Sequence, residues 1–215
     1  MRLICVAMFI VCLVSTRAWS ADKITEQLLV AAENGDNAKV QSLLAAGAKA
    51  NAKGKGQKTP LLAAVSNNHI DTVRLLLHHG ADVNGRGTDR KATPLFSAAA
   101  AGFDSLVSEL ISSGADVNAG DVDGWTPLLR AARYNRVSTI QILLDHGADV
   151  NHRTVSNYTA LMSAARWGCT DAVRALVAAG ADVNMTGRDG RSALTWARES
   201  SVSEIIDVLV QAGAM

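Results

Sequence analysis

The chain has 215 residues, with 21 Lys and Arg against 20 Asp and Glu and a formal net charge of +1 at pH 7. A charge so close to balance excludes a general attraction of the whole protein to nucleic acid. No low-complexity linker and no second domain are visible, so one folded domain is expected behind a short N-terminal segment.

Residues 1–20 are typical of a secretory signal peptide. Arg2 supplies a positive charge, residues 3–14 are mostly apolar, and the small residues Ala18 and Ser20 precede an expected cleavage near Ala21. The apolar run is shorter than the roughly 20 residues that cross a bilayer, so we expect no stable membrane insertion after its removal. Cleavage after Ala18 or Ala21 is an alternative. The mature chain is therefore expected in the periplasm or secreted.

The rest of the chain repeats every 33 or 34 residues. Each repeat closes on Gly-Ala-Asp-Val-Asn or a variant of it, and the copies begin at Gly47, Gly80, Gly114, Gly147 and Gly180. A second marker, Thr-Pro-Leu or a degraded form of it, keeps the same step and begins at Thr59, Thr93, Thr126, Thr159 and Ser192. A fixed period of this length predicts a solenoid, in which each unit buries its apolar face against its neighbours.

One unit, residues 121–153, shows how the pattern specifies structure. Thr126 is placed to cap a helix, and Pro127 suits its first position, where no backbone N–H is needed. A second helix is expected from about residue 137, because apolar side chains recur there at helical spacing. Gly147 then ends that helix in a left-handed conformation. Each unit is therefore predicted to be two helices followed by an extended turn.

The Thr-Pro-Leu openings and Gly-Ala-Asp-Val-Asn closings, at this spacing, resemble those of the ankyrin repeat family. The resemblance covers residues 21–215 and implies an all-α ankyrin-repeat solenoid of stacked helix-turn-helix units with extended turn loops. Six repeats fit the register, at residues 21–53, 54–87, 88–120, 121–153, 154–186 and 187–215.

The chain departs from the family pattern in one respect. The family usually has a histidine after Thr-Pro-Leu, whereas this chain has Leu62, Phe96, Leu129, Met162 and Thr195. The hydrogen-bond network of the loops is therefore expected to be satisfied in another way.

The resemblance implies a protein-binding face made of loop tips and first helices. Two adjoining repeats bring an aromatic and basic set onto that face, and we predict it as the docking patch: Trp125, Arg133, Tyr134, Tyr158, Arg166 and Trp167. These residue types dominate interface hot spots, and their side chains are expected to point away from the packing between repeats. The alternative is that the arginines stack on the aromatic rings and only cover the inner groove.

A second, basic group crowds the first two loops and consists of Lys53, Lys55, Lys58, Arg86, Arg90 and Lys91. Such a row could steer an acidic partner or an anionic surface. A solvated loop kept soluble by its charge explains the same residues. The basic and aromatic groups lie in different repeats, so the interleaving that binds single-stranded nucleic acid is absent and no nucleic-acid partner is expected.

No catalytic, cofactor or metal site is predicted. His79 and His146 hold equivalent places two repeats apart, too far to share an ion, and His146 with His152 would supply only two ligands. Cys169, the one cysteine outside the signal segment, has no histidine in register to act as a base, and it cannot form an internal disulfide.

The resemblance and the docking patch together indicate a non-catalytic protein–protein interaction module, exported and expected to be a monomer. The signal type suggests a bacterial source, and a eukaryotic secreted protein stays open. The alternative function is a secreted effector or inhibitor that docks on a foreign or toxic protein through the same surface.

Overall fold

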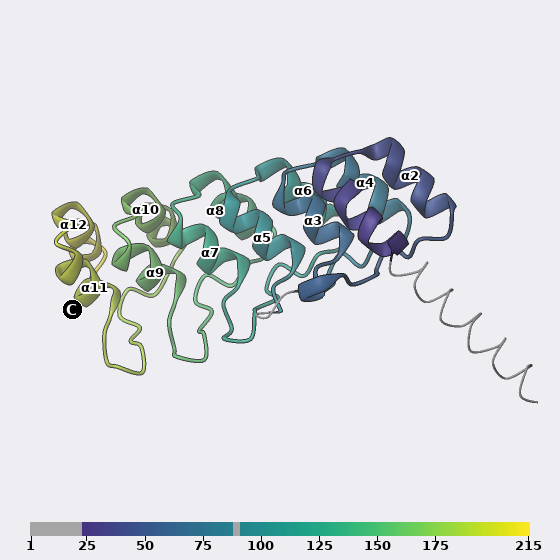
Figure 1. Cartoon of the computed structure of the whole chain (residues 1–215). Coiled ribbons are helices and arrows are strands. Elements are labelled where there is room, and N and C mark those ends of the chain that lie inside the picture. Colours follow the sequence, from purple (N-terminus) through teal and green to yellow (C-terminus); the bar gives the residue numbers. More distant parts are fainter. Residues whose placement is uncertain (1–22, 88–90) are drawn as a thin grey trace, which may run out of the picture. The chain divides into compact units, whose positions relative to one another are not determined.

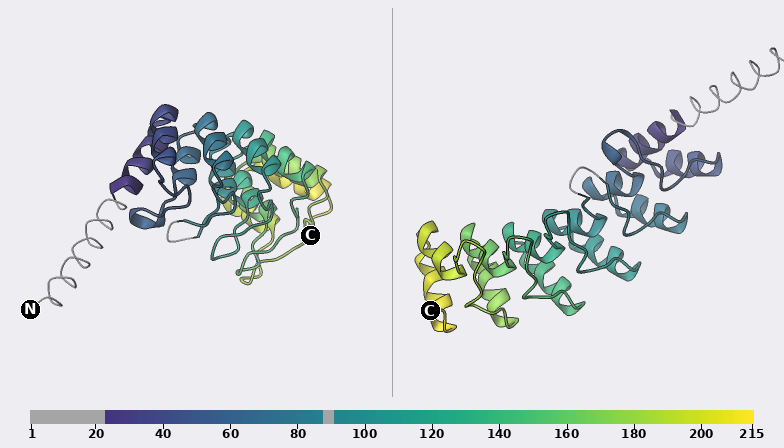
Figure 2. Two further views of the ribbon diagram at one scale, coloured as in Figure 1. Left: turned by 90° about the vertical axis from the view of Figure 1, so that its right-hand side faces the viewer. Right: turned by 90° about the horizontal axis from the view of Figure 1, so that it is seen from below.

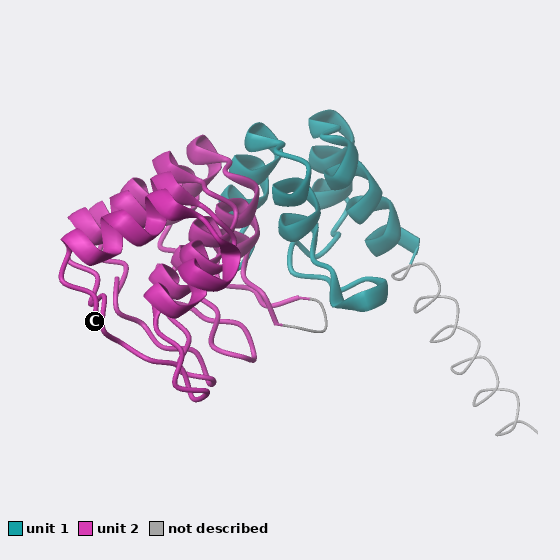
Figure 3. Cartoon of the chain, turned by 90° about the vertical axis from the view of Figure 1, so that its left-hand side faces the viewer, with its two compact units in different colours: residues 1–82 teal, residues 83–215 magenta. Residues whose placement is uncertain are grey.

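The structure is a computed structural model that describes residues 23–87 and 91–215. The expected signal peptide, residues 1–20, lies outside this part of the chain. The chain divides into two compact units, Met1–Asp82 and Val83–Met215, which are described separately (Figure 3).

The first unit consists of helices that pack in pairs (Figure 1). Residues 23–34 are helical, and α2 (Asn37–Ala45) follows after a short turn. A short 3-10 helix, η1 (Lys55–Gln57), lies in the next loop, and α3 (Pro60–Ser66) and α4 (Ile70–His78) form the second pair. Helix α4 packs against both α3 and α2.

The second unit repeats the pair four times. Its first helices are α5 (Pro94–Ala101), α7 (Pro127–Arg133), α9 (Ala160–Arg166) and α11 (Ala193–Ser200). Its second helices are α6 (Asp104–Ser112), α8 (Val137–Asp145), α10 (Thr170–Ala178) and α12 (Ser203–Gln211). Each first helix packs on its own second helix and on the next first helix, so the unit has two helical layers with loops at one edge (Figures 1 and 2).

Within the part of the chain that the structure describes, extended pairing is limited to two isolated bridges, Gly87 with Ala92 and Thr186 with Ser192. The prediction of an all-α fold is therefore confirmed. No helix in residues 23–87 or 91–215 combines the length and the apolar character needed to cross a membrane.

The first helices α3, α5, α7, α9 and α11 begin as the sequence predicts. In α7 the Thr126 hydroxyl accepts a hydrogen bond from the Leu129 N–H, and Pro127 occupies the first turn. The same capping bond recurs at Thr59, Thr93, Thr159 and Ser192. Leu129 itself is fully buried, so the position that usually holds histidine in the family is part of the apolar core here.

Asparagine side chains join successive repeats instead. The Asn118 Nδ2 donates to the Gly147 carbonyl at 3.1 Å, and its Oδ1 accepts from the Asp149 N–H at 2.9 Å. Asn51, Asn84 and Asn184 make the same two bonds to the following turn, and Asn151 accepts the equivalent N–H of Asp182. One side chain therefore satisfies a donor and an acceptor that the helix end and its turn would otherwise leave unpaired.

Gly147 ends α8 in the left-handed region, with φ +84°. A Cβ built there meets nothing within 4 Å, so a substitution would strain only the backbone. We expect Gly147→Ala to lower the free energy of unfolding by about 1 kcal/mol, and Gly147→Asn to cost less because asparagine tolerates this conformation.

Urea denaturation of the wild type and both variants measures this difference. Equal stability of all three proteins would show that the left-handed cap contributes nothing.

Candidate protein-docking site

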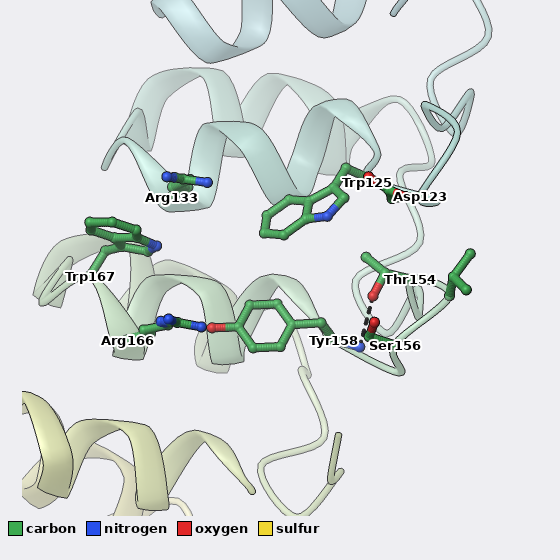
Figure 4. Close-up of a pocket in the computed structure, with 9 residues that line it drawn as sticks. Asp123, Trp125, Arg133, Thr154, Ser156, Tyr158, Arg166 and Trp167 are labelled. Carbon is green, nitrogen blue, oxygen red and sulfur yellow. Dashed lines mark hydrogen bonds between the residues drawn. The ribbon is translucent and has the colours of Figure 1, made fainter. Parts of the chain in front are cut away.

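A hollow of about 570 Å³ lies on the second unit. It is lined by side chains from the loops before α7 and α9 and from the C-terminal ends of these helices: Asp123, Trp125, Arg133, Thr154, Val155, Ser156, Tyr158, Arg166 and Trp167 (Figure 4). Five of the six residues predicted for the docking patch therefore line one hollow.

Tyr134, the sixth predicted residue, does not line the hollow. It lies at the C-terminal cap of α7 and is 45% exposed. The guanidinium of Arg133 is 5.6 Å from the centre of its ring, so Tyr134 contacts the site only from outside.

The site is built from three positions, each occupied twice at the repeat period. Trp125 and Tyr158 are equivalent loop residues, Arg133 and Arg166 are equivalent helix residues, and Tyr134 is the counterpart of Trp167. Since α7 and α9 pack side by side, equivalent side chains become neighbours. The repeat period therefore places six residues of the required chemistry at equivalent positions of two adjoining repeats, and five of them line the hollow.

Two side chains hold the loops that carry the aromatic residues. The Asp121 carboxylate accepts from the N–H groups of Asp123 and Trp125, both at 2.9 Å. One repeat later, the Thr154 hydroxyl accepts from the Tyr158 N–H at 2.9 Å. The two loops are tied together directly, because the N–H after Thr154 donates to the Asp123 carbonyl. Hydrogen bonds therefore fix the conformation of both loops that carry the aromatic residues.

The rings differ in depth. Trp125 and Tyr158 are half-buried, with ring centres 5.7 Å apart, and Tyr158 also lies 6.0 Å from Trp196. The Tyr158 hydroxyl donates to the Met162 carbonyl. The expectation that all these side chains point away from the packing between repeats is therefore wrong for Trp125 and Tyr158, whose rings pack on neighbouring rings. It holds for Trp167, which is 53% exposed.

The arginines do stack on aromatic rings, as the alternative hypothesis proposed. The Arg133 guanidinium is 4.5 Å from the ring centre of Trp167, and that of Arg166 is 4.3 Å from Trp196. Stacking holds the planar guanidinium in place but leaves its N–H edges directed sideways. Because Arg133 is only half-buried and Arg166 is exposed, stacking here does not remove these arginines from the surface.

Two residues of this cluster were not predicted from the sequence. Trp196 is 93% buried in α11 between two guanidinium groups, and Arg130 lies over the rings of Phe96 and Trp125. A signal was present, since Arg130 and Trp196 occupy the same repeat position two repeats apart. The position is the second after the Thr-Pro-Leu segment, within the first helix, where the sequence pattern predicts only packing.

Comparison with known families identifies the architecture. The model of the family described as ankyrin repeats (3 copies) matches residues 28–121, 99–187 and 153–215. The chain belongs to the ankyrin repeat family. The predicted ankyrin solenoid is thereby confirmed, while the boundaries of the six repeats stay a prediction. A search of curated proteins gives no match.

Ankyrin repeats are generally modules for protein–protein interaction and are typically non-catalytic. In this ankyrin chain, no group of three or more His, Cys, Asp or Glu within residues 23–87 and 91–215 could hold a metal ion. The rings of His146 and His152 lie instead against backbone carbonyls, with His146 Nδ1 2.7 Å from Ile142 O and His152 Nε2 3.0 Å from Gly124 O.

The predicted basic residues have different interactions in the ankyrin structure. Lys53, Lys55 and Lys58 lie in the first unit, and Lys58 forms an ion pair with Glu33 at 2.9 Å. In the second unit, Arg86 donates to the carbonyls of Gly120 and Lys91 and so ties neighbouring loops. Arg90 lies outside the described residues. Lys53, Lys55 and Lys91 are exposed.

Burial raises the pKa of two groups, the Tyr158 phenol of the site and the Cys169 thiol outside it. Desolvation raises the pKa of Tyr158 above its ordinary 10.0, and the hydrogen bond and charge of Arg166 oppose that rise only in part. Burial likewise raises the pKa of the Cys169 thiol, whose Sγ lies 3.4 Å from the Arg133 carbonyl. At neutral pH the phenol and the thiol are therefore both protonated.

The stability of the ankyrin domain should depend on Tyr158 at alkaline pH. Because folding holds the proton on Tyr158, its contribution is fully present below pH 10.0, the pKa expected when unfolded, and declines as the pH rises through the higher folded value. The ultraviolet absorbance of phenolate, compared between the wild type and Tyr158→Phe, isolates this titration because the chain has only two tyrosines. A difference titration at or below pH 10.0 in the folded protein contradicts the assignment.

Proposed function

We propose that this ankyrin repeat protein is an exported, non-catalytic module that binds a partner protein through the hollow on its second unit. The observation that carries the proposal is the exposure of Trp167, at 53%, beside a hollow that two further aromatic residues and two arginines line. A folded monomer seldom leaves an indole in water next to other aromatic surface unless something covers it.

The difference in burial between the rings suggests that they have different roles in binding. Trp125 and Tyr158 form a floor that their neighbours hold rigid, and Trp167 stands at one end as a wall. A preformed floor lowers the entropy that a partner must offset when it binds. Since the Trp167 ring is largely exposed, its removal should affect binding more than folding.

Export and oligomeric state complete the proposal. The pattern of residues 1–20 supports secretion, and the balanced charge and short apolar run support a mature chain that is free of the membrane. We propose that the chain acts as a monomer. Docking on a foreign or toxic protein uses the same surface, so the origin of the partner separates an effector from a resident binding module.

Trp167→Ala tests the surface. We expect this variant to lose about 2 kcal/mol of binding, about thirtyfold in affinity, with little change in melting temperature, because its ring is largely in water. Affinity capture from the exported fraction identifies the partner, and its Kd is then measured for the wild type and the variant. Trp125→Ala should lower both affinity and melting temperature, since its ring also packs on Tyr158.

Val210→Ala is the matched control, because Val210 is an exposed apolar residue on α12, outside the hollow. Equal losses of affinity for Trp167→Ala and Val210→Ala, or unchanged affinity for Trp167→Ala, would show that the hollow does not bind the partner. A partner that comes from the producing cell supports a resident module, and one from a foreign cell supports the effector alternative.

Export has its own test. The mature chain should begin near Ala21 and be recovered in the soluble fraction beyond the cytoplasmic membrane. N-terminal sequencing after cell fractionation measures the start. An intact Met1 in the membrane pellet would contradict export by a cleaved signal.

A further inference from the structure

We infer that the hollow receives an acidic segment of the partner, with a carboxylate held between Arg133 and Arg166 and an adjacent apolar side chain packed on Trp167. This inference rests on the proposed function and narrows it, because it specifies the chemistry that the partner must present. The charges, the stacking and the size of the hollow carry it.

The two arginines of the hollow differ from others nearby. Arg130 is 4.0 Å from the Asp121 carboxylate, and Arg191 is 3.3 Å from that of Glu199. Within residues 23–87 and 91–215, neither Arg133 nor Arg166 forms an ion pair. These two guanidinium groups are therefore not neutralised by the residues that surround them.

The charge lining the hollow is uneven. Asp123 is the one acidic residue among its nine lining residues, against two arginines. Figure 4 shows Asp123 beside Trp125 at one end, and both arginines toward the Trp167 end. The arginine end therefore carries a positive potential, which attracts a carboxylate and repels a cation.

Stacking prepares the arginines for this ligand. Each guanidinium lies over an indole ring, which limits the rotamers that binding would otherwise have to fix. The fork of N–H groups at the edge of a guanidinium matches the two oxygens of a carboxylate. Arg166 also reaches the Tyr158 hydroxyl, but that group is neutral and leaves the positive charge uncompensated (Figure 4).

The size of the hollow favours a peptide segment over a small ion. A volume of about 570 Å³ is far larger than one carboxylate or phosphate, and three of the lining residues besides the arginines are aromatic: Trp125, Tyr158 and Trp167. A segment with an acidic residue beside an apolar residue would place a carboxylate at the arginines and an apolar side chain on the aromatic rings. An isolated anion would leave the aromatic surface in water. A nucleic-acid strand fits poorly, because two arginines do not form a basic track along a backbone.

Two labelled peptides of equal length test the inference on the full chain. One carries Glu-Leu-Glu in a glycine–serine frame, and the other carries Gln-Leu-Gln, so that they differ only in charge. By fluorescence anisotropy we expect the acidic peptide to bind about tenfold more tightly, and added salt to weaken only that peptide.

Variants of the arginines connect this preference to the hollow. Arg133→Gln and Arg166→Gln should each lower affinity for the acidic peptide about tenfold and leave the amide peptide unaffected. Arg166→Lys should retain part of the affinity, because it keeps the charge without the fork. Arg174→Gln is the control, since Arg174 lies on α10 outside the hollow and pairs with Glu204.

Several results would overturn the inference. These are equal affinity for the two peptides, no binding of the acidic peptide at millimolar concentration, an equal loss with Arg174→Gln, and displacement of the peptide by an equal concentration of inorganic phosphate. If the captured partner still requires Trp167 while any of these holds, the proposed function stands and the acidic specificity is wrong.

Discussion

The structure depends on one recurring interaction, the asparagine side chain that holds the next repeat by two backbone groups. In residues 23–87 and 91–215 the loops have only two isolated β-bridges, so their other N–H and C=O groups need other partners. Asn84 and Asn118 supply them, each with one donor and one acceptor to the following turn. Because each asparagine amide bonds to the same two backbone atoms of the following turn, it sets the register between neighbouring repeats. It also provides hydrogen-bond partners for those two atoms.

The proposed docking site follows from that register. Arg133 and Arg166 become neighbours only because consecutive first helices lie at a constant spacing, and the same holds for Trp125 and Tyr158. The half-buried rings of Trp125 and Tyr158 strengthen the contact between repeats, whereas Trp167 is largely exposed. If the proposed function holds, substitutions of Trp125 and Tyr158 affect both stability and binding, and substitution of Trp167 affects mainly binding.

The sequence predicted the elements whose determinants are local. Thr126 caps α7 and Gly147 ends α8 because a hydroxyl and a left-handed turn act within a few residues. The period also predicted which side chains of the site share a face, since equivalent positions are translated copies. Depth was not predicted, because the burial of Tyr158 depends on Trp196 in the next repeat, where Thr-Pro-Leu is degraded. Nor could the sequence show that Arg86 turns toward backbone carbonyls, since that choice depends on a loop one repeat away.

The doubled arrangement of the site also determines where it ends. In the repeat before Trp125, the three equivalent positions are Ala92, Ala100 and Ala101, which are too small to form walls. In the repeat after Trp167, two of them are Arg191 and Glu199, which neutralise each other. The proposed recognition surface therefore depends on side chains at three positions of two adjacent repeats. The capping threonines and the asparagines that hold the backbone lie at other positions, so different side chains at these three would change the specificity and keep the fold.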